Sequence, residues 1–142
     1  ESMDTIIIAY WTQTGNTKAM AEAVGEGVET AGKKADVRHI SEVSMDRLRE
    51  AQAFALGCPA MGAEVLEEGE FEPFFTALEG KLSGKKVALF GSYGWGDGEW
   101  MRNWEETCRE DGAVLACDCV ICNDAPDAEA ESACEELGKA LA

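Results

Sequence analysis

The chain has 142 residues, of which 46% are hydrophobic, which suits one domain with a buried core and argues against disorder. Its 28 acidic and 12 basic residues give a formal net charge of −16, which excludes nucleic acid and anionic membranes as favoured partners. No apolar run approaches the ~20 residues of a membrane span, and no signal peptide precedes the first predicted strand, so we expect a cytoplasmic protein.

Short apolar runs, several of them β-branched, alternate with amphipathic stretches along the whole chain. They predict strands over residues 5–10, 34–40, 53–57, 86–90 and 114–121, with Asp118 interrupting the last. They predict helices over residues 17–31, 45–51, 71–78, 99–111 and 127–142. This alternation implies an α/β fold with helices on both faces of a parallel sheet. Right-handed crossovers leave few topologies, and the order 2-1-3-4-5 fits, with the polar strand 34–40 at an edge. We expect one domain over residues 1–142, in which Glu1 and Ser2 are interpreted as residues left by cloning.

The segment between the first predicted strand and helix has the composition of an anion site. A helix N-terminus offers unpaired N–H groups and the positive end of the helix dipole. The hydroxyls of Thr12, Thr14 and Thr17 and the amide of Asn16 can add hydrogen bonds to a phosphate without adding charge. The segment is neither a P-loop, since it lacks Gly-Lys, nor a dinucleotide fingerprint, since Gly15 is its single glycine. The alternative is a turn that merely caps the helix.

A second loop, after the strand over residues 86–90, combines three glycines with aromatic side chains. The glycines let the backbone approach a ligand closely and leave Tyr93 and Trp95 open to solvent. A flat aromatic ligand would explain this exposure, and stacking on Trp95 would contribute about 0.5–1.5 kcal/mol beyond area burial. The alternative is that Trp95 folds back onto the core. Because ligands of such folds bind beyond the carboxyl ends of the strands, both loops should converge on one site.

Three segments together resemble the phosphate loop and the two isoalloxazine loops of the short-chain flavodoxins of anaerobic bacteria. They are Thr12–Thr17, Cys58–Glu64 and Gly91–Trp100, and the match covers nearly the whole chain in order and spacing. The resemblance implies a flavodoxin-like three-layer sandwich that binds FMN without a covalent bond. It implies a low-potential one-electron carrier, not an enzyme, that shuttles between semiquinone and hydroquinone. The carrier is expected to act as a monomer with redox partner proteins that present basic docking patches.

The resemblance also implies the residues that contact the cofactor. In the family an aromatic residue at the position of Trp95 stacks on the outer flavin face, and Met61 would pack on the inner face. Glu64 matches the carboxylate that accepts a hydrogen bond from flavin N3–H, while Pro59 stands where some relatives place a serine. The expected cofactor-binding residues are Thr12, Gln13, Thr14, Gly15, Asn16, Thr17, Pro59, Ala60, Met61, Gly62, Ala63, Glu64, Ser92, Tyr93, Gly94, Trp95, Gly96, Gly98 and Asn123. No catalytic residue and no metal ligand is expected.

Acidic side chains surround the expected flavin ring. The family's hydroquinone is anionic, so Glu64, Glu67 and Glu68 should oppose its formation. One carboxylate about 12 Å away costs roughly 1.4 kcal/mol at an effective dielectric of 20, or about 59 mV. Replacing the three by glutamine should therefore raise the semiquinone/hydroquinone potential.

A peptide flip at Gly62-Ala63 is also implied by the resemblance, because in the family this carbonyl accepts the proton gained at flavin N5. The flipped turn should resemble type II, which requires a positive φ at Ala63. That geometry costs a residue other than glycine roughly 1–2 kcal/mol. We therefore expect a semiquinone less stabilised than in relatives with glycine there.

The chain contains six cysteines, for which the sequence suggests no redox or metal-binding role. Cys119 and Cys122 form a C-x-x-C motif, but no second such pair exists and the single histidine, His39, is remote, so inert thiols are expected.

One alternative function is an FMN-dependent quinone or metal-ion reductase on the same fold. A response-regulator receiver domain is another, although the acidic pair that it needs after the first strand is missing. A flavodoxin domain of a larger reductase is the third.

Overall fold

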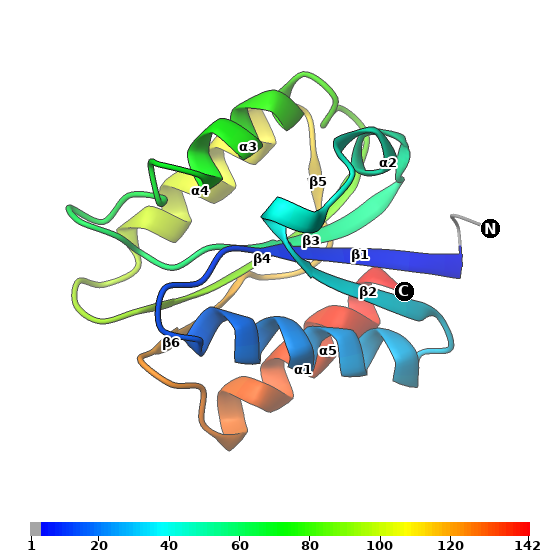
Figure 1. Ribbon diagram of the computed structural model, residues 1–142. Coiled ribbons are helices and arrows are strands. Elements are labelled where there is room, and N and C mark those ends of the chain that lie inside the picture. The colour runs from blue at the N-terminus through cyan, green and yellow to red at the C-terminus, as the bar shows by residue number, and fades with distance from the viewer. Residues whose placement is uncertain (1–3) are drawn as a thin grey trace.

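The computed structural model describes residues 4–142, so Glu1 and Ser2 lie outside the described residues. Its strands are β1 (Thr5–Tyr10), β2 (Lys34–His39), β3 (Ala53–Gly57), β4 (Lys86–Tyr93), β5 (Val114–Leu115) and β6 (Val120–Asn123). Its helices are α1 (Asn16–Thr30), η2 (a 3-10 helix, Ile40–Glu42), α2 (Met45–Glu50), α3 (Phe71–Glu79), α4 (Glu99–Glu110) and α5 (Ala128–Leu141). Figure 1 shows α1 and α5 on one face of the sheet and α3 and α4 on the other.

All neighbouring strands pair in parallel, in the order β2-β1-β3-β4, with β5 and β6 both beside β4. The predicted strand order is therefore confirmed, and the polar strand β2 lies at the edge. The fifth position is divided between two short strands. Leu115 pairs with Val87, and Val120 pairs with Phe90. The segment from Leu115 to Val120 therefore advances by five residues where β4 advances by three. The extra residues, which include Asp118, bulge out of the ladder.

Alternate residues of the inner strands face opposite helical layers, as the two-residue period of a strand requires. In β1, Ile7 packs in the core beneath α3 and α4, which includes Phe71 and Trp104. Its neighbour Ile8 packs on the other side, in the core that α1 and α5 cover with Val24 and Leu137. Burial on both faces explains why the inner strands read as continuous apolar runs. The loops after β1, β3 and β4 all lie at one end of the sheet, the left end in Figure 1.

Two glycines allow α1 and α5 to pack backbone to backbone. A Cβ added at Gly27 would lie 1.9 Å from the carbonyl oxygen of Glu135, and one at Gly138 would lie 2.1 Å from that of Val24. No side chain fits at these distances. The contact fixes the direction of α1, whose first turn belongs to the candidate site.

On the other face, the end of α3 brings the carboxyl of Glu79 to that of Asp111, which follows α4. Burial, and then Asp111 as hydrogen-bond partner and as charge, raise the pKa of Glu79 to about 7. A proton held between the two groups would give Asp111 Oδ2 a partner, since this buried oxygen has none among the described residues. The pair thus holds a proton in the folded state near neutral pH.

Stability is therefore expected to fall as pH rises through the range that this pair titrates. Between the ordinary glutamate value of 4.5 and about 7, the folded chain binds more protons than the unfolded chain, so the free energy of unfolding decreases with pH. After discounting for solvent exposure, we expect a loss of roughly 1 kcal/mol from pH 5 to pH 8. Glu79→Gln should remove it in urea unfolding across that range, whereas Glu110→Gln on the exposed side of α4 should not. An unchanged slope in Glu79→Gln would contradict this assignment.

Candidate functional site

The first turn of α1 presents donors toward the end of the sheet. Gly15 caps the helix with φ of 98°, a left-handed conformation that favours glycine, and its N–H donates to Thr12 Oγ1 at 3.0 Å. The first helical N–H groups have no acceptor within the helix. Thr17 is 1% exposed and Ser92 5% exposed, and their hydroxyl oxygens lie 3.1 Å apart. Two loops 75 residues apart in sequence thus bring a pair of buried hydroxyls to one helix N-terminus.

A cavity of about 170 Å³ opens beside this hydroxyl pair. It lies beyond the carboxyl ends of the central strands, where the fold was expected to bind its ligand. The predicted residues that line it are Thr12, Gln13, Thr14, Asn16, Thr17, Pro59, Ala60, Met61, Ser92, Tyr93 and Gly94. The three loops therefore converge on one cavity. This convergence favours a ligand site over the alternative that the first loop only caps a helix.

Asp124 also lines this cavity, although the predicted set holds its neighbour Asn123 instead. Asp124 adopts a positive φ of 58°, and its N–H donates to the carbonyl of Tyr93 at 2.8 Å. Asn123 donates its side-chain amide to the same carbonyl at 3.3 Å and lines a neighbouring hollow against α5. Only the position of the loop after the last strand could have pointed to Asp124.

Glu64 and Gly96, two predicted residues that do not line the cavity, form a contact between the second and third loops. Met61 and Val65 exchange two backbone hydrogen bonds, at 2.8 and 3.0 Å, which close a tight hairpin. From this hairpin Glu64 accepts the N–H of Glu99 at 3.0 Å, a favourable place for an anion at the start of α4. A Cβ on Gly96 would lie 2.4 Å from the Glu64 carboxyl carbon, so only glycine permits this approach.

The backbone of this hairpin differs from the flipped turn expected for it. Within the hairpin between Met61 and Val65, positive φ falls on Gly62 (52°) and Glu64 (57°) and not on Ala63. The cost of the left-handed conformation is thus borne by Glu64 in this structure. The expectation for Ala63 in the flipped turn stays a prediction.

Aromatic side chains in the third loop have different surroundings. Trp95 is 63% exposed, so it does not fold back onto the core, and that alternative is wrong. Tyr93 is half-buried and packs on Trp100, with ring centroids 5.6 Å apart. Trp100 in turn donates its indole N–H to the carbonyl of Cys58 at 3.1 Å. The second and third loops are therefore joined beneath the site by a buried aromatic residue of α4.

Two acidic residues that precede α3 also hold the loops, and the sequence did not reveal their contacts. Glu67 accepts the N–H groups of Gly69, Glu70 and Phe71 at 2.7–2.8 Å. Burial raises the pKa of Glu67, but these three donors outweigh it and lower the pKa below its usual value. Glu70 accepts the indole N–H of Trp11 at 2.6 Å, which ties the end of β1 to the start of α3.

The six cysteines are free thiols, spread over both cores and the last strands. Burial, followed by the carboxyl of Glu105, raises the pKa of Cys119 to about 12, and burial likewise raises that of Cys122. Thiols so rarely ionised are poor nucleophiles, which supports the interpretation of the C-x-x-C motif as inert. No group of three His, Cys, Asp or Glu side chains in residues 4–142 could hold a metal ion.

Residues 8–138 match the family model for flavodoxin. The chain belongs to the flavodoxin family. It is 50% identical over 135 residues to a flavodoxin of Clostridium beijerinckii, covering 95% of this chain and 97% of the relative. It is 45% identical over 135 residues to a flavodoxin of Megasphaera elsdenii, covering 95% and 96%. The solution structure of the two-electron reduced Megasphaera flavodoxin superimposes with a TM-score of 0.87 over 96% of this chain and 97% of that one, at 45% identity.

Family membership establishes an FMN-binding electron carrier that acts with redox partner proteins and is not an enzyme. The resemblance to short-chain flavodoxins of anaerobic bacteria is thereby confirmed. The residues present fit the cofactor: buried hydroxyls and a helix N-terminus suit a phosphate, and the exposed Trp95 suits a flat ring. Within residues 4–142, no helix combines the length and apolar character that a membrane crossing needs.

Proposed function

We propose that the FMN phosphate binds at the first turn of α1 and that the isoalloxazine ring lies between Met61 and Trp95. The observation that carries this assignment is the buried hydroxyl pair of Thr17 and Ser92 beside the free N–H groups of α1. One hydroxyl donates to the other, so while this bond stands one O–H is left to donate to a phosphate oxygen, and the helix dipole adds positive potential. The predicted site residues that do not line the cavity, above all Glu64, Trp95 and Gly96, would then surround the ring.

FMN supplies the one-electron chemistry, and the chain's own part is to bind the ring and limit its access to water. Glu64 can accept the N3–H of the ring, because a carboxylate offers only acceptors. To do so it would exchange its present donor, the N–H of Glu99, for the flavin. Gly96 leaves the space in which that carboxylate turns.

An anaerobic dithionite titration of the FMN-loaded chain tests the carrier proposal. Uptake of electrons in two separate one-electron steps is expected, with the second at low potential. Steady NADPH-driven quinone reduction by the chain alone would contradict the proposal and favour a reductase. The assay should include a known quinone reductase as a positive control, so that a lack of turnover by the chain can be assigned to the chain and not to the assay.

Carboxylates near the ring are expected to lower the potential of the second reduction, and Glu68 offers the cleanest test. Glu68 is exposed and Glu64 is half-buried, whereas Glu67 caps α3 and its replacement would disturb the loop. Replacing Glu68 alone by glutamine should raise this potential by up to about 60 mV at low salt, from about 59 mV per charge. The shift should shrink as ionic strength rises.

Glu29→Gln is the matched control, because it removes one charge near the far end of α1. Its potential should stay within about 10 mV of the parent at moderate salt, given a Debye length of roughly 10 Å. Equal shifts in Glu29→Gln and Glu68→Gln would mean that net charge acts, and not the position of the carboxylate.

The partner proteins should meet the chain through basic patches, because its net charge is −16. Such contacts are typically small and transient, which suits a monomeric carrier. Six unpaired cysteines support a reducing compartment such as the cytoplasm. The rate of electron delivery to a basic acceptor should fall as salt increases.

A further inference from the structure

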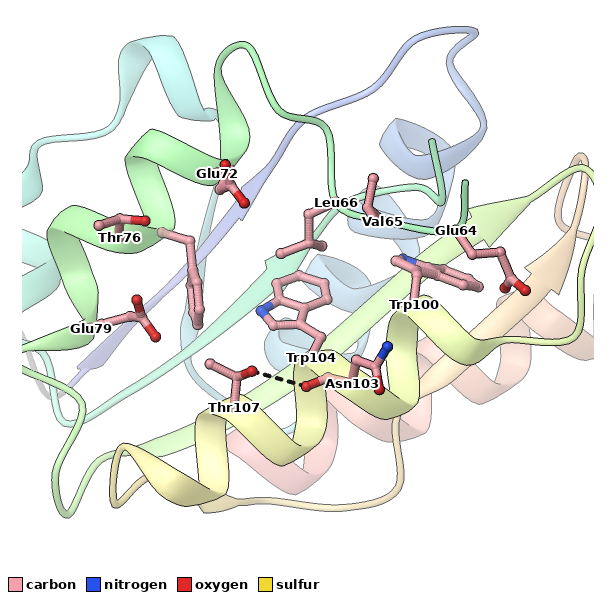
Figure 2. A pocket seen from close by; sticks show the side chains of 11 residues that line it. Glu64, Val65, Leu66, Glu72, Thr76, Glu79, Trp100, Asn103, Trp104 and Thr107 are labelled. Carbon is pink, nitrogen blue, oxygen red and sulfur yellow. Dashed lines mark hydrogen bonds between the residues drawn. The ribbon is translucent and has the colours of Figure 1, made fainter. Parts of the chain in front are cut away.

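A second pocket, distinct from the FMN cavity, lies between α3 and α4 under the second loop (Figure 2). Its volume is about 220 Å³, and its lining shares no residue with that of the FMN cavity. On α3 it is lined by Glu72, Phe75, Thr76 and Glu79, and on α4 by Trp100, Asn103, Trp104 and Thr107. On each helix these positions follow the spacing i, i+3, i+4, i+7, so each set forms one stripe and the two stripes face each other.

The floor of this pocket contains a hydrogen-bond donor without an acceptor. Trp104 is 2% exposed, and its indole Nε1 has no partner among the described residues. Figure 2 shows this nitrogen at the edge of the ring that faces Glu79 and Thr107. Leaving a buried donor unpaired is unfavourable, so a ligand that offers an acceptor here would be stabilised. Glu79 and Thr107 are only partly buried, so they can turn aside for a ligand that offers an acceptor.

The rim of the pocket carries negative charge over an aromatic floor. Its lining includes the carboxylates of Glu64, Glu72 and Glu79 and, within the described residues, no basic side chain. Phe75 and Trp104 meet edge to face, with ring centroids 6.0 Å apart, and form an apolar surface below these charges. Organic cations favour acidic rims above aromatic rings, through ion pairs and cation–π contact.

We propose that this pocket binds a small aromatic amine that carries a hydrogen-bond acceptor on its ring. The ring would lie on Phe75 and Trp104, the acceptor would take the Trp104 N–H, and the ammonium would pair with the carboxylates of α3. The volume fits a ligand of about ten non-hydrogen atoms, since a cavity of roughly 150 Å³ in another protein holds benzene. Glu64, at the rim, is the one lining residue that the proposed function also assigns to the flavin ring, and the contacts proposed for the amine use only α3 and α4, so they do not depend on the FMN assignment.

Tyramine is the direct probe, with nitrogen-15 NMR of the indole N–H groups as the measurement. At pH 8 on the FMN-saturated chain, tyramine should shift the Trp104 N–H resonance, with saturation in the high micromolar to millimolar range. Trp104→Phe identifies that resonance among the four tryptophans. Phenethylamine, which lacks the hydroxyl, should bind about 5-fold more weakly, and 4-hydroxyphenylacetate, which reverses the charge, at least 10-fold more weakly.

Variants separate this site from general attraction to an acidic protein. Glu72→Gln combined with Glu79→Gln should weaken tyramine at least 5-fold, whereas Glu106→Gln, on an exposed part of α4, should leave it within 2-fold. Equal binding of tyramine and 4-hydroxyphenylacetate, or equal losses in both variants, would overturn the proposal. So would an unmoved Trp104 resonance at 10 mM tyramine, the result expected if water or the Phe75 ring satisfies this N–H.

Discussion

Replacing Thr14 and Thr17 by valine is expected to weaken FMN binding by at least 100-fold. Valine keeps the shape and β-branching of threonine but removes the hydroxyl. Hydrogen bonds to charged groups contribute about 1.5–3 kcal/mol each, so two losses give at least 3 kcal/mol, or more than 100-fold. Thr17 should contribute most, because it is buried and its hydroxyl lies 3.1 Å from that of Ser92.

Fluorescence titration with FMN and with riboflavin measures this effect and locates it. Riboflavin has no phosphate, so its affinity should change less than 3-fold in the double variant. Thr30→Val is the control, because Thr30 is exposed at the far end of α1. If riboflavin weakened as much as FMN, the threonines would act on the shape of the site and not on the phosphate.

Gly27→Ala is expected to lower the free energy of unfolding by about 3 kcal/mol, the upper part of the usual range for overpacking. The added Cβ would lie 1.9 Å from the backbone oxygen of Glu135, and a backbone atom cannot move aside as the end of a side chain can. The two helices must therefore separate, which opens the core around Val24 and Leu137. FMN affinity should fall with stability, because α1 carries the phosphate-binding turn.

Urea unfolding of the chain without FMN measures the change without interference from ligand binding. Gly80→Ala is the matched control, since a Cβ at Gly80 meets nothing within 4 Å and its backbone is right-handed helical. This control should be neutral or slightly stabilising, because alanine restricts the unfolded chain more than glycine does. A tolerated Gly27→Ala would mean that α1 and α5 are not held as closely as the structure has them.

Local patterns were sufficient for most of the fold and for much of the site. The apolar runs of β1, β3 and β4 are buried on both faces, so composition alone identifies them. The Thr12–Thr17 loop could be found because its chemistry is contiguous in sequence. Asp118 was expected to interrupt the fifth strand, but the extent of the break over residues 116–119 and the continuation of the strand to Asn123 could not be predicted, since only pairing with β4 reveals them.

Contacts between distant side chains could not be predicted from the sequence. Trp11 and Glu70 are 59 residues apart, and no period or spacing links them. The helix predicted over residues 71–78 does begin at Phe71, but no sequence pattern indicated that the Glu67 carboxylate accepts the N–H groups at its start. Asp124 entered the site through a left-handed backbone conformation that an aspartate adopts more readily than most residues.

Titration of the chain with FMN and riboflavin, followed by flavin and tryptophan fluorescence, tests the central claim most directly. If the turn at the start of α1 holds the phosphate and Trp95 covers the ring, FMN should bind at least 100-fold more tightly than riboflavin, with both emissions quenched. Equal affinity for the two flavins, or flavin emission that stays unquenched, would contradict the account.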